Sequence, residues 1–155
     1  MEFGEEYAKQ VIVNAKAMAN ALSDEGLNVL ASKLGFTESH QIAVDVTKYG
    51  DGGSLEKDLE KANIIVNRQL IPGDIQAGRH YMHPGGLRLG TSEVTRLGMK
   101  KDEMKQIASL MGRIIVKKED PVKIKKEVEG IRSSYQKVHY AFETGTPAYK
   151  YIKIR

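Results

Sequence analysis

The sequence predicts an α+β domain in which a small antiparallel or mixed sheet carries helices packed on one face. Three features support this class. Segments with strand-like alternation are short and few, longer segments with helical periodicity accompany them, and the connections differ widely in length. A doubly wound parallel sheet would need a more regular alternation of strands and helices. The 155 residues fit one domain with a core of its own.

The first predicted element is a helix over residues 3–25, whose apolar residues recur every three or four positions along one face. Gly26 is well placed to end it in a left-handed conformation. Because this helix begins almost at Met1 without a capping residue, we expect the sequence to be a piece of a longer chain.

Three short strands are predicted next, at residues 27–30, 41–47 and 64–66. The segment 41–47 alternates most clearly between apolar and polar residues. Between the second and third strands, residues 51–53 are predicted to form a turn, after which Ser54 caps a short helix.

A long irregular stretch at 69–86 follows, rich in glycine and polar residues, and compact domains rarely keep such a loop without a use. It leads into a short strand at 87–89 and a brief helix that ends at Gly98. Residues 102–115 follow the helical pattern i, i+3, i+4, i+7 and predict a long helix.

The C-terminal part is predicted to hold one more helix and a short strand. Asp120 and Pro121 form a start signal, in which a capping carboxylate precedes a proline at the first helical position. The apolar stripe of this helix is predicted to continue as far as Phe142. Residues 151–154 are predicted to add an edge strand.

The composition is that of an ordinary globular protein, with 41% hydrophobic and 28% charged residues. No apolar run approaches the length of a membrane span, and the acidic N-terminus lacks the order of a signal peptide. The absence of cysteine excludes disulfides, thiolate metal sites and a cysteine nucleophile. We therefore expect a cytoplasmic protein without a membrane partner.

The net charge of +4 raises the question of nucleic-acid binding. The densest basic stretch, residues 117–126, is interrupted by Glu119 and Asp120. This mixture is typical of a solvated helix face, so no nucleic-acid partner is expected.

Three kinds of site find little support in the sequence, namely a metal site, a nucleophile elbow and a phosphate-binding loop. His80 and His83 lie three residues apart, but they fall in a loop without a nearby carboxylate ligand, so no metal site is predicted. Neither a nucleophile elbow nor a phosphate-binding glycine loop with its lysine is present.

Arg88 is the strongest candidate for a binding residue. Alternation along the strand places Leu87 and Leu89 on one face and Arg88 on the other. A guanidinium held by a rigid strand presents a fixed fork that suits a carboxylate. A surface ion pair is the alternative, and the residues alone leave it open.

The sequence segments around Arg88 resemble those of a known family. Residues 86–91, Gly-Leu-Arg-Leu-Gly-Thr, followed by Val-Thr-Arg-Leu-Gly-Met at 94–99, resemble the signature near the C-terminus of serine hydroxymethyltransferases. Further segments resemble the family in the same order, namely 13–19, 40–45 and 62–67 followed by Pro72. The resemblance spans about Tyr7 to Val116, and its order and spacing make it specific.

This resemblance implies the small domain of a fold-type I pyridoxal-phosphate enzyme, a cytoplasmic homodimer that interconverts serine and glycine. The one-carbon unit passes to a reduced pterin, either tetrahydrofolate or tetrahydromethanopterin. The arginine that matches Arg88 binds the carboxylate of the amino acid. The family's Schiff-base lysine, its aspartate at the pyridine nitrogen and its phosphate cradle are missing here. We therefore expect a C-terminal fragment that is inactive alone and whose partner is the N-terminal pyridoxal-phosphate domain.

The sequence departs from the folate-using members at two places. Gln69 stands where they carry asparagine, and the loop after Pro72 is longer, with a His-Tyr-Met-His insert at 80–83. These features resemble archaeal members, and they suggest Gln69 and Tyr81 as pterin-binding residues.

The region beyond Val116 resembles nothing that we can assign from the sequence. We therefore divide the chain into a family-like domain at 1–116 and a helical extension at 117–155. A stand-alone basic regulatory or nucleic-acid-binding module is the alternative function.

Overall fold

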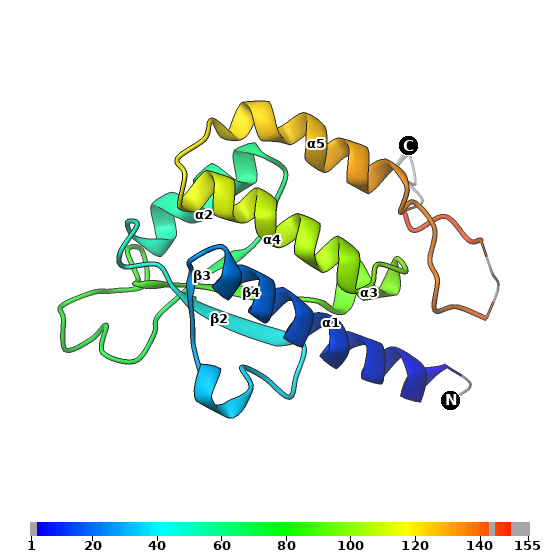
Figure 1. Cartoon of the computed structure of the whole chain (residues 1–155), viewed down its shortest axis with the longest axis horizontal. Helices are drawn as coiled ribbons and strands as arrows, with labels where there is room; N and C mark the ends of the chain where they lie inside the picture. Colours follow the sequence, from blue (N-terminus) through cyan, green and yellow to red (C-terminus); the bar gives the residue numbers. More distant parts are fainter. Residues whose placement is uncertain (1–2, 143–144, 150–155) are drawn as a thin grey trace, which may run out of the picture.

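The computed structural model describes residues 3–142 and 145–149 (Figure 1). In chain order the elements are α1 (Gly4–Asp24), β1 (Asn28–Val29), the 3-10 helix η1 (Ser32–Leu34), β2 (Gln41–Asp45), α2 (Gly52–Lys61), β3 (Asn67–Gln69), β4 (Gly86–Gly90), α3 (Ser92–Arg96), α4 (Lys101–Ile115) and α5 (Pro121–Ser133). The strands form one sheet in the order β1-β2-β4-β3, and each neighbouring pair is antiparallel. The predicted α+β class is confirmed.

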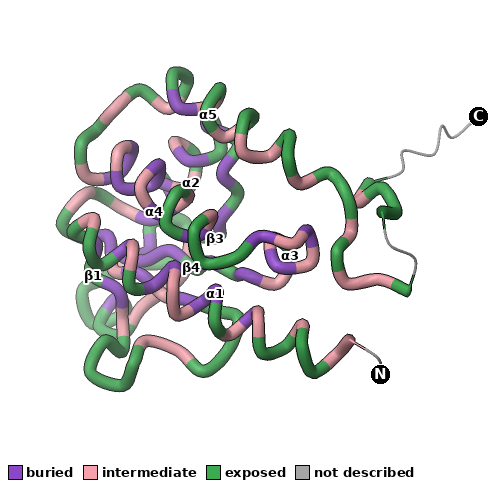
Figure 2. Tube along the Cα trace, turned by 45° about the vertical axis from the view of Figure 1, so that its right-hand side comes forward, coloured by how far each residue is buried: buried purple, intermediate pink, exposed green. Residues whose placement is uncertain are grey.

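The long helices cover one face of this sheet (Figure 1). Ile42 pairs with Leu89 and Val44 with Leu87, and all four side chains are buried beneath the helices. Figure 2 shows this buried layer between the sheet and α1, α2 and α4. Because side chains alternate along a strand, the residues between these four face the opposite side of the sheet.

Polar groups inside the core tie α1 to the segment that follows β4. The buried amide of Asn14 donates hydrogen bonds to Thr95 Oγ1 at 2.9 Å and to the Met99 carbonyl at 2.8 Å. The buried hydroxyl of Thr91 donates to the Val11 carbonyl at 3.0 Å. Since buried polar groups are costly unless paired, these bonds fix the helix relative to the end of β4.

Two predicted elements in the middle of the chain are wrong. Residues 51–53 are not a free turn, because α2 begins at Gly52, and Asp51 rather than Ser54 is its cap. The Asp51 side chain accepts a hydrogen bond from the Ser54 amide at 3.1 Å. The strand predicted at 64–66 lies outside the sheet. Asn63 before it adopts a left-handed conformation, and pairing with β4 begins only at Asn67.

The last helix is shorter than predicted. Its start at Pro121, with Asp120 accepting a hydrogen bond from the Val122 amide, is confirmed. It ends at Ser133, so the apolar stripe does not continue to Phe142, whose side chain is exposed. The edge strand predicted at 151–154 falls outside the described residues. None of the helices in the described part of the chain is long and apolar enough to cross a membrane.

Candidate functional site

Arg88 lies at the centre of the sheet face that the helices leave open. On β4 its neighbours Leu87 and Leu89 are buried, whereas Arg88 itself is exposed, which confirms the predicted alternation. Across the sheet Arg88 pairs with Ala43 of β2 and Asn67 of β3. Directly opposed residues point to the same face, so these three side chains share the open side.

The guanidinium of Arg88 has one hydrogen-bond acceptor among the described residues. Its Nη2 donates to Asn67 Oδ1 at 3.2 Å. No carboxylate of the described residues lies within ion-pair distance of Arg88, so the surface ion pair considered from the sequence is not formed there. The geometry leaves most of the fork available to an external carboxylate.

A hollow of about 440 Å³ opens over this face. Its floor includes Gln41, Ala43 and Arg88 from the two central strands. One wall is formed by the segment around η1, and the opposite wall by the chain that leaves β3. The residues of these walls are Leu30, Ala31 and Phe36 on one side and Gln69, Leu70, Ile71 and Pro72 on the other. The hollow thus combines apolar walls with a few polar groups, as small-molecule sites do.

The structure brings Gln69 into the same hollow as Arg88 but leaves Tyr81 outside its lining. The side-chain nitrogen of Gln69 donates a hydrogen bond to the Leu70 carbonyl at 3.1 Å. No described residue donates a hydrogen bond to the side-chain oxygen of Gln69. Tyr81 is exposed, and the guanidinium carbon of Arg68 lies 5.5 Å from its ring centre. Arg68 forms an ion pair with Glu56 at 2.8 Å, and this pair holds the Arg68 guanidinium away from the hollow.

Asp74 anchors the long loop that borders the hollow. Its carboxylate is buried and accepts hydrogen bonds from the Ile71 amide at 2.9 Å and the Gly85 amide at 2.8 Å. Arg79 lies 3.6 Å from the same carboxylate. Both ends of the loop are thereby joined at one side chain. Sequence reasoning missed Asp74, although an aspartate after Pro-Gly is a common turn residue that bonds to nearby backbone.

Asn67 is the second residue that sequence reasoning left without a role. It belongs to a segment that resembles the family, but the sequence predicts the strand at 64–66, three residues too early. The signal that could have found it is the register of β3 on β4, in which Asn67 stands opposite Arg88.

A carboxylate that stays ionised lies on the same open face. Burial raises the pKa of Asp45, but hydrogen bonds from Thr47 and Asn28 and the positive charge of Arg79 outweigh it, so the pKa is lower than usual. Asp45 is occupied by these donors, with Thr47 Oγ1 at 2.7 Å and Asn28 Nδ2 at 3.0 Å. It therefore does not neutralise Arg88.

Among the described residues, none that lines the hollow around Arg88 is a lysine. The two loop histidines lie close to each other and to Asp51. His83 Nδ1 lies 3.3 Å from Asp51 Oδ1 and the His80 and His83 rings are 5.5 Å apart, yet the described part of the chain holds no metal-ligating group of three or more residues.

Comparison with known proteins places these features in one family. The model of the serine hydroxymethyltransferase family matches residues 1–111. Serine hydroxymethyltransferases of Nitrosopumilus maritimus and Cenarchaeum symbiosum are 60% and 57% identical to the chain over all 155 residues. The serine hydroxymethyltransferase of Korarchaeum cryptofilum is 56% identical over 151 residues. Region 117–155, for which the sequence alone offered no resemblance, is therefore shared with archaeal relatives.

A solved structure agrees with these matches. The crystal structure of L-threonine transaldolase from Pseudomonas fluorescens superimposes with a TM-score of 0.73 at 30% sequence identity, and it covers 86% of this chain and 29% of that one. The chain also spans only 35% of the length of the first two archaeal relatives. None of these matches favours the alternative of a nucleic-acid-binding module. The chain belongs to the serine hydroxymethyltransferase family.

Proposed function

We propose that the chain works within a longer pyridoxal-phosphate-dependent serine hydroxymethyltransferase, where Arg88 binds the carboxylate of the amino-acid substrate. The longer enzyme would interconvert serine and glycine and exchange a one-carbon unit with a reduced pterin. The observation that carries this proposal is the exposed guanidinium of Arg88. It is fixed on the central strand and lies over a hollow without a carboxylate partner among the described residues.

Two groups of this chain would share the task of holding the substrate. The Arg88 fork would bind the two carboxylate oxygens through parallel hydrogen bonds. Asn67 would fix the plane of that fork from the neighbouring strand, 3.2 Å away. Orienting a substrate in this way lowers the barrier by several kcal/mol, because rotational freedom is lost before the reaction step.

The other components of the site belong to the same proposal. Pyridoxal phosphate, when bound, supplies an electron sink. Since none of the described residues that line the hollow is a lysine, we expect this cofactor to be held mainly by an N-terminal domain, and the 155 residues to be inactive alone. Gln69 and Tyr81 are proposed pterin contacts, with tetrahydrofolate or tetrahydromethanopterin as the carrier. We further propose a cytoplasmic homodimer, in which residues 1–116 form the C-terminal domain typical of serine hydroxymethyltransferases and residues 117–155 a helical extension.

The substitution Arg88→Lys in the full-length enzyme tests the proposal. Lysine keeps the charge but loses the fork, so we expect kcat/KM for serine to fall by about 100-fold or more while the protein stays folded. The matched control is Arg68→Lys, because Arg68 pairs with Glu56 outside the hollow. Near-normal kinetics of a folded Arg88→Lys enzyme would remove Arg88 from the substrate site.

A further inference from the structure

A second cavity lies on the opposite side of the sheet from Arg88, between β4, α4 and α5. Its volume is about 180 Å³. Its walls are predominantly apolar and come from α1, α3, α4, α5, β4 and the segment 63–66. The apolar residues that line it include Met18, Leu89, Met99, Ile107, Met111 and Val128. Leu89 faces this cavity while the adjacent Arg88 faces the other side, so the two sites are separated by the thickness of the sheet.

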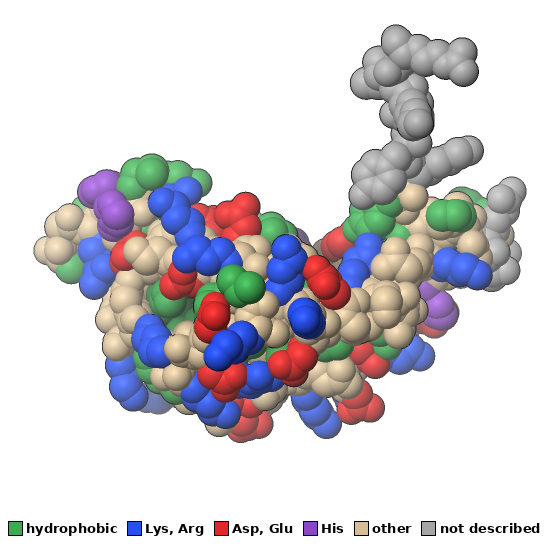
Figure 3. Space-filling model, turned by 90° about the horizontal axis from the view of Figure 1, so that it is seen from above, with side chains coloured by type: hydrophobic (Ala, Val, Ile, Leu, Met, Phe, Trp, Pro, Cys, Tyr) green, Lys and Arg blue, Asp and Glu red, His purple; other side chains and the backbone are tan. Residues whose placement is uncertain are grey.

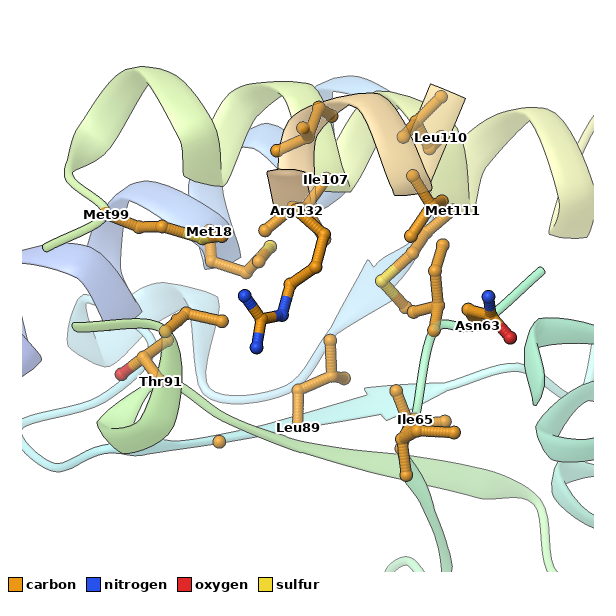
Figure 4. Close-up of a pocket in the computed structure, with 16 residues that line it drawn as sticks. Met18, Asn63, Ile65, Leu89, Thr91, Met99, Ile107, Leu110, Met111 and Arg132 are labelled. Carbon is orange, nitrogen blue, oxygen red and sulfur yellow. The ribbon is translucent and has the colours of Figure 1, made fainter. Parts of the chain in front are cut away.

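Arg132 places a positive charge in this apolar cavity. Figure 4 shows its side chain extending from α5 between Met18 and Leu89, with the guanidinium directed into the space that the lining residues surround. Such a group is unfavourable in apolar surroundings unless hydrogen bonds or an opposite charge compensate it.

Arg132 is partly buried, and the described residues give it a hydrogen bond and a ring contact but no ion pair. Its Nη1 donates to the Tyr135 carbonyl, and the Tyr149 ring centre lies 5.1 Å from its guanidinium carbon. No carboxylate of the described part of the chain lies within ion-pair distance of it. Glu93 is near enough for its pKa to respond to Arg132, but Arg96 holds that carboxylate with two hydrogen bonds of 2.7 and 2.8 Å.

From this combination we infer that the cavity binds a small organic anion, namely a carboxylate attached to a single ring or a similarly sized apolar body. The carboxylate would bind the Arg132 guanidinium, and the apolar body would contact the methionine, leucine and isoleucine walls. The volume supports this size, because an apolar protein cavity of about 150 Å³ accepts a benzene ring. The inference does not depend on the proposed role of Arg88.

Benzoate is a suitable probe, and the methionine methyl groups can report where it binds. In the full-length protein with labelled methionine methyl groups, we expect benzoate to shift the resonances of Met18, Met99 and Met111 in a saturable manner. The resonance of Met82, which is half-exposed on the long loop away from the cavity, serves as the internal control. Benzyl alcohol, which lacks the charge, should bind at least about tenfold more weakly.

Two matched substitutions separate this site from the hollow over Arg88. Arg132→Gln should weaken benzoate binding by at least about tenfold, whereas Arg88→Gln should leave it unchanged, because the two guanidinium groups lie on opposite sides of the sheet. Val128→Phe should also weaken binding, since the larger ring fills the cavity. The inference is overturned if benzoate leaves the three cavity methionines unshifted, or if Arg88→Gln abolishes binding while Arg132→Gln does not.

Discussion

Asn67 determines how the Arg88 guanidinium is presented on the open face of the sheet. The hydrogen bond of 3.2 Å joins the side chains of two directly opposed residues on neighbouring strands. Cross-strand pairs of this kind are rigid because both backbones are held in the sheet. The neutral amide is important, since it accepts a hydrogen bond from the fork without neutralising its charge.

The substitution Asn67→Asp in the full-length enzyme tests this role. The new carboxylate would form an ion pair with Arg88 and compete with the substrate carboxylate, so we expect KM for serine to rise by about tenfold or more. Asn67→Ala is the control, because it removes the hydrogen bond without adding a competing charge, and it should raise KM only a few-fold. Equal KM values for the two variants would contradict competition by the new charge.

At the scale of single residues, the sequence predicted the sheet face to which Arg88 points but not its hydrogen-bond partner. Alternation of Leu87, Arg88 and Leu89 depends only on local strand geometry, and the structure confirms it. The partner Asn67 depends on the register between strands far apart in the sequence. Such a register is set by tertiary pairing, which local periodicity does not contain.

The N-terminus of α2 packs against the end of the long loop, and this contact requires glycine at position 52. The Gly52 amide donates to the Pro84 carbonyl at 2.7 Å. A Cβ at position 52 would lie 2.2 Å from the Gly86 carbonyl oxygen, which belongs to the central strand and cannot move easily. The close approach places α2 directly beside the start of the strand that carries Arg88.

We therefore expect opposite effects from alanine at two helix glycines. Gly52→Ala should lower the free energy of unfolding by about 1–3 kcal/mol, as overpacking of this kind does. Gly130→Ala, near the C-terminal end of α5 with open space around it, should raise the free energy of unfolding by about 0.5–1 kcal/mol through helix propensity. Denaturant unfolding of both variants measures the two effects. Stabilisation by Gly52→Ala would refute the tight contact.

Arg113 connects the end of α4 to the start and body of α5. Its guanidinium donates to Glu119 at 3.0 Å and to Glu127 at 2.8 Å. Hydrogen bonds and the charge of Arg113 outweigh desolvation and lower the pKa of both carboxyl groups. This pairing also explains part of the charge pattern, since basic and acidic side chains are interspersed on the surface seen in Figure 3.

The substitution Arg113→Gln should therefore have a pH-dependent effect. Because the folded pKa values of Glu119 and Glu127 are depressed, their contribution to stability is present above the ordinary value of 4.5 and is lost as the pH falls below it. We expect the difference in unfolding free energy between wild type and variant to be constant from neutral pH to about 4.5 and to shrink in acid. High salt should also reduce it. A difference independent of pH and salt would show that Arg113 acts through packing alone.

Helical elements were easier to predict than strands, for a physical reason. The segment of α4 repeats its apolar pattern over four turns, and the start of α5 is fixed by Asp120 and Pro121, so both signals are local. The strand β3 has only three residues and exists because β4 lies beside it. The end of α5 at Ser133 does not follow the apolar spacing of the sequence. Tyr135, which continues the apolar spacing, packs against the core from beyond the helix.

At the scale of the whole molecule, the sheet separates two environments. One face carries the helices and nearly all of the core, and the other holds Arg88, Gln69 and the hollow. The sequence predicted this one-sided arrangement correctly, because it combines few short strands with longer helices and because the segments 41–47 and 87–89 alternate between apolar and polar residues. The hollow itself could not be predicted, since its walls come from two segments that are far apart in the sequence and do not follow a regular pattern.

The same arrangement gives a prediction about the one-carbon carrier. Gln69 lines the same hollow as Arg88. The family resemblance of the sequence implies asparagine at this position in the folate-using members. Glutamine keeps the donor and acceptor of the amide but places them one methylene further from the backbone. Tyr81 lies outside the lining, beside Arg68, so Gln69 is the better placed of the two to select between pterins.

The decisive comparison measures kcat/KM of the full-length enzyme with tetrahydromethanopterin and with tetrahydrofolate. We expect the wild type to prefer the modified pterin and Gln69→Asn to shift the ratio toward tetrahydrofolate by several-fold or more, as loss of one well-placed hydrogen bond does. A second variant with the 80–83 insert removed tests whether the loop contributes, and Tyr81→Ala tests its aromatic ring. KM for serine serves as the internal control, because Arg88 is unchanged in all three variants. A carrier ratio that is the same in the wild type and every variant would exclude both Gln69 and the loop from carrier selection.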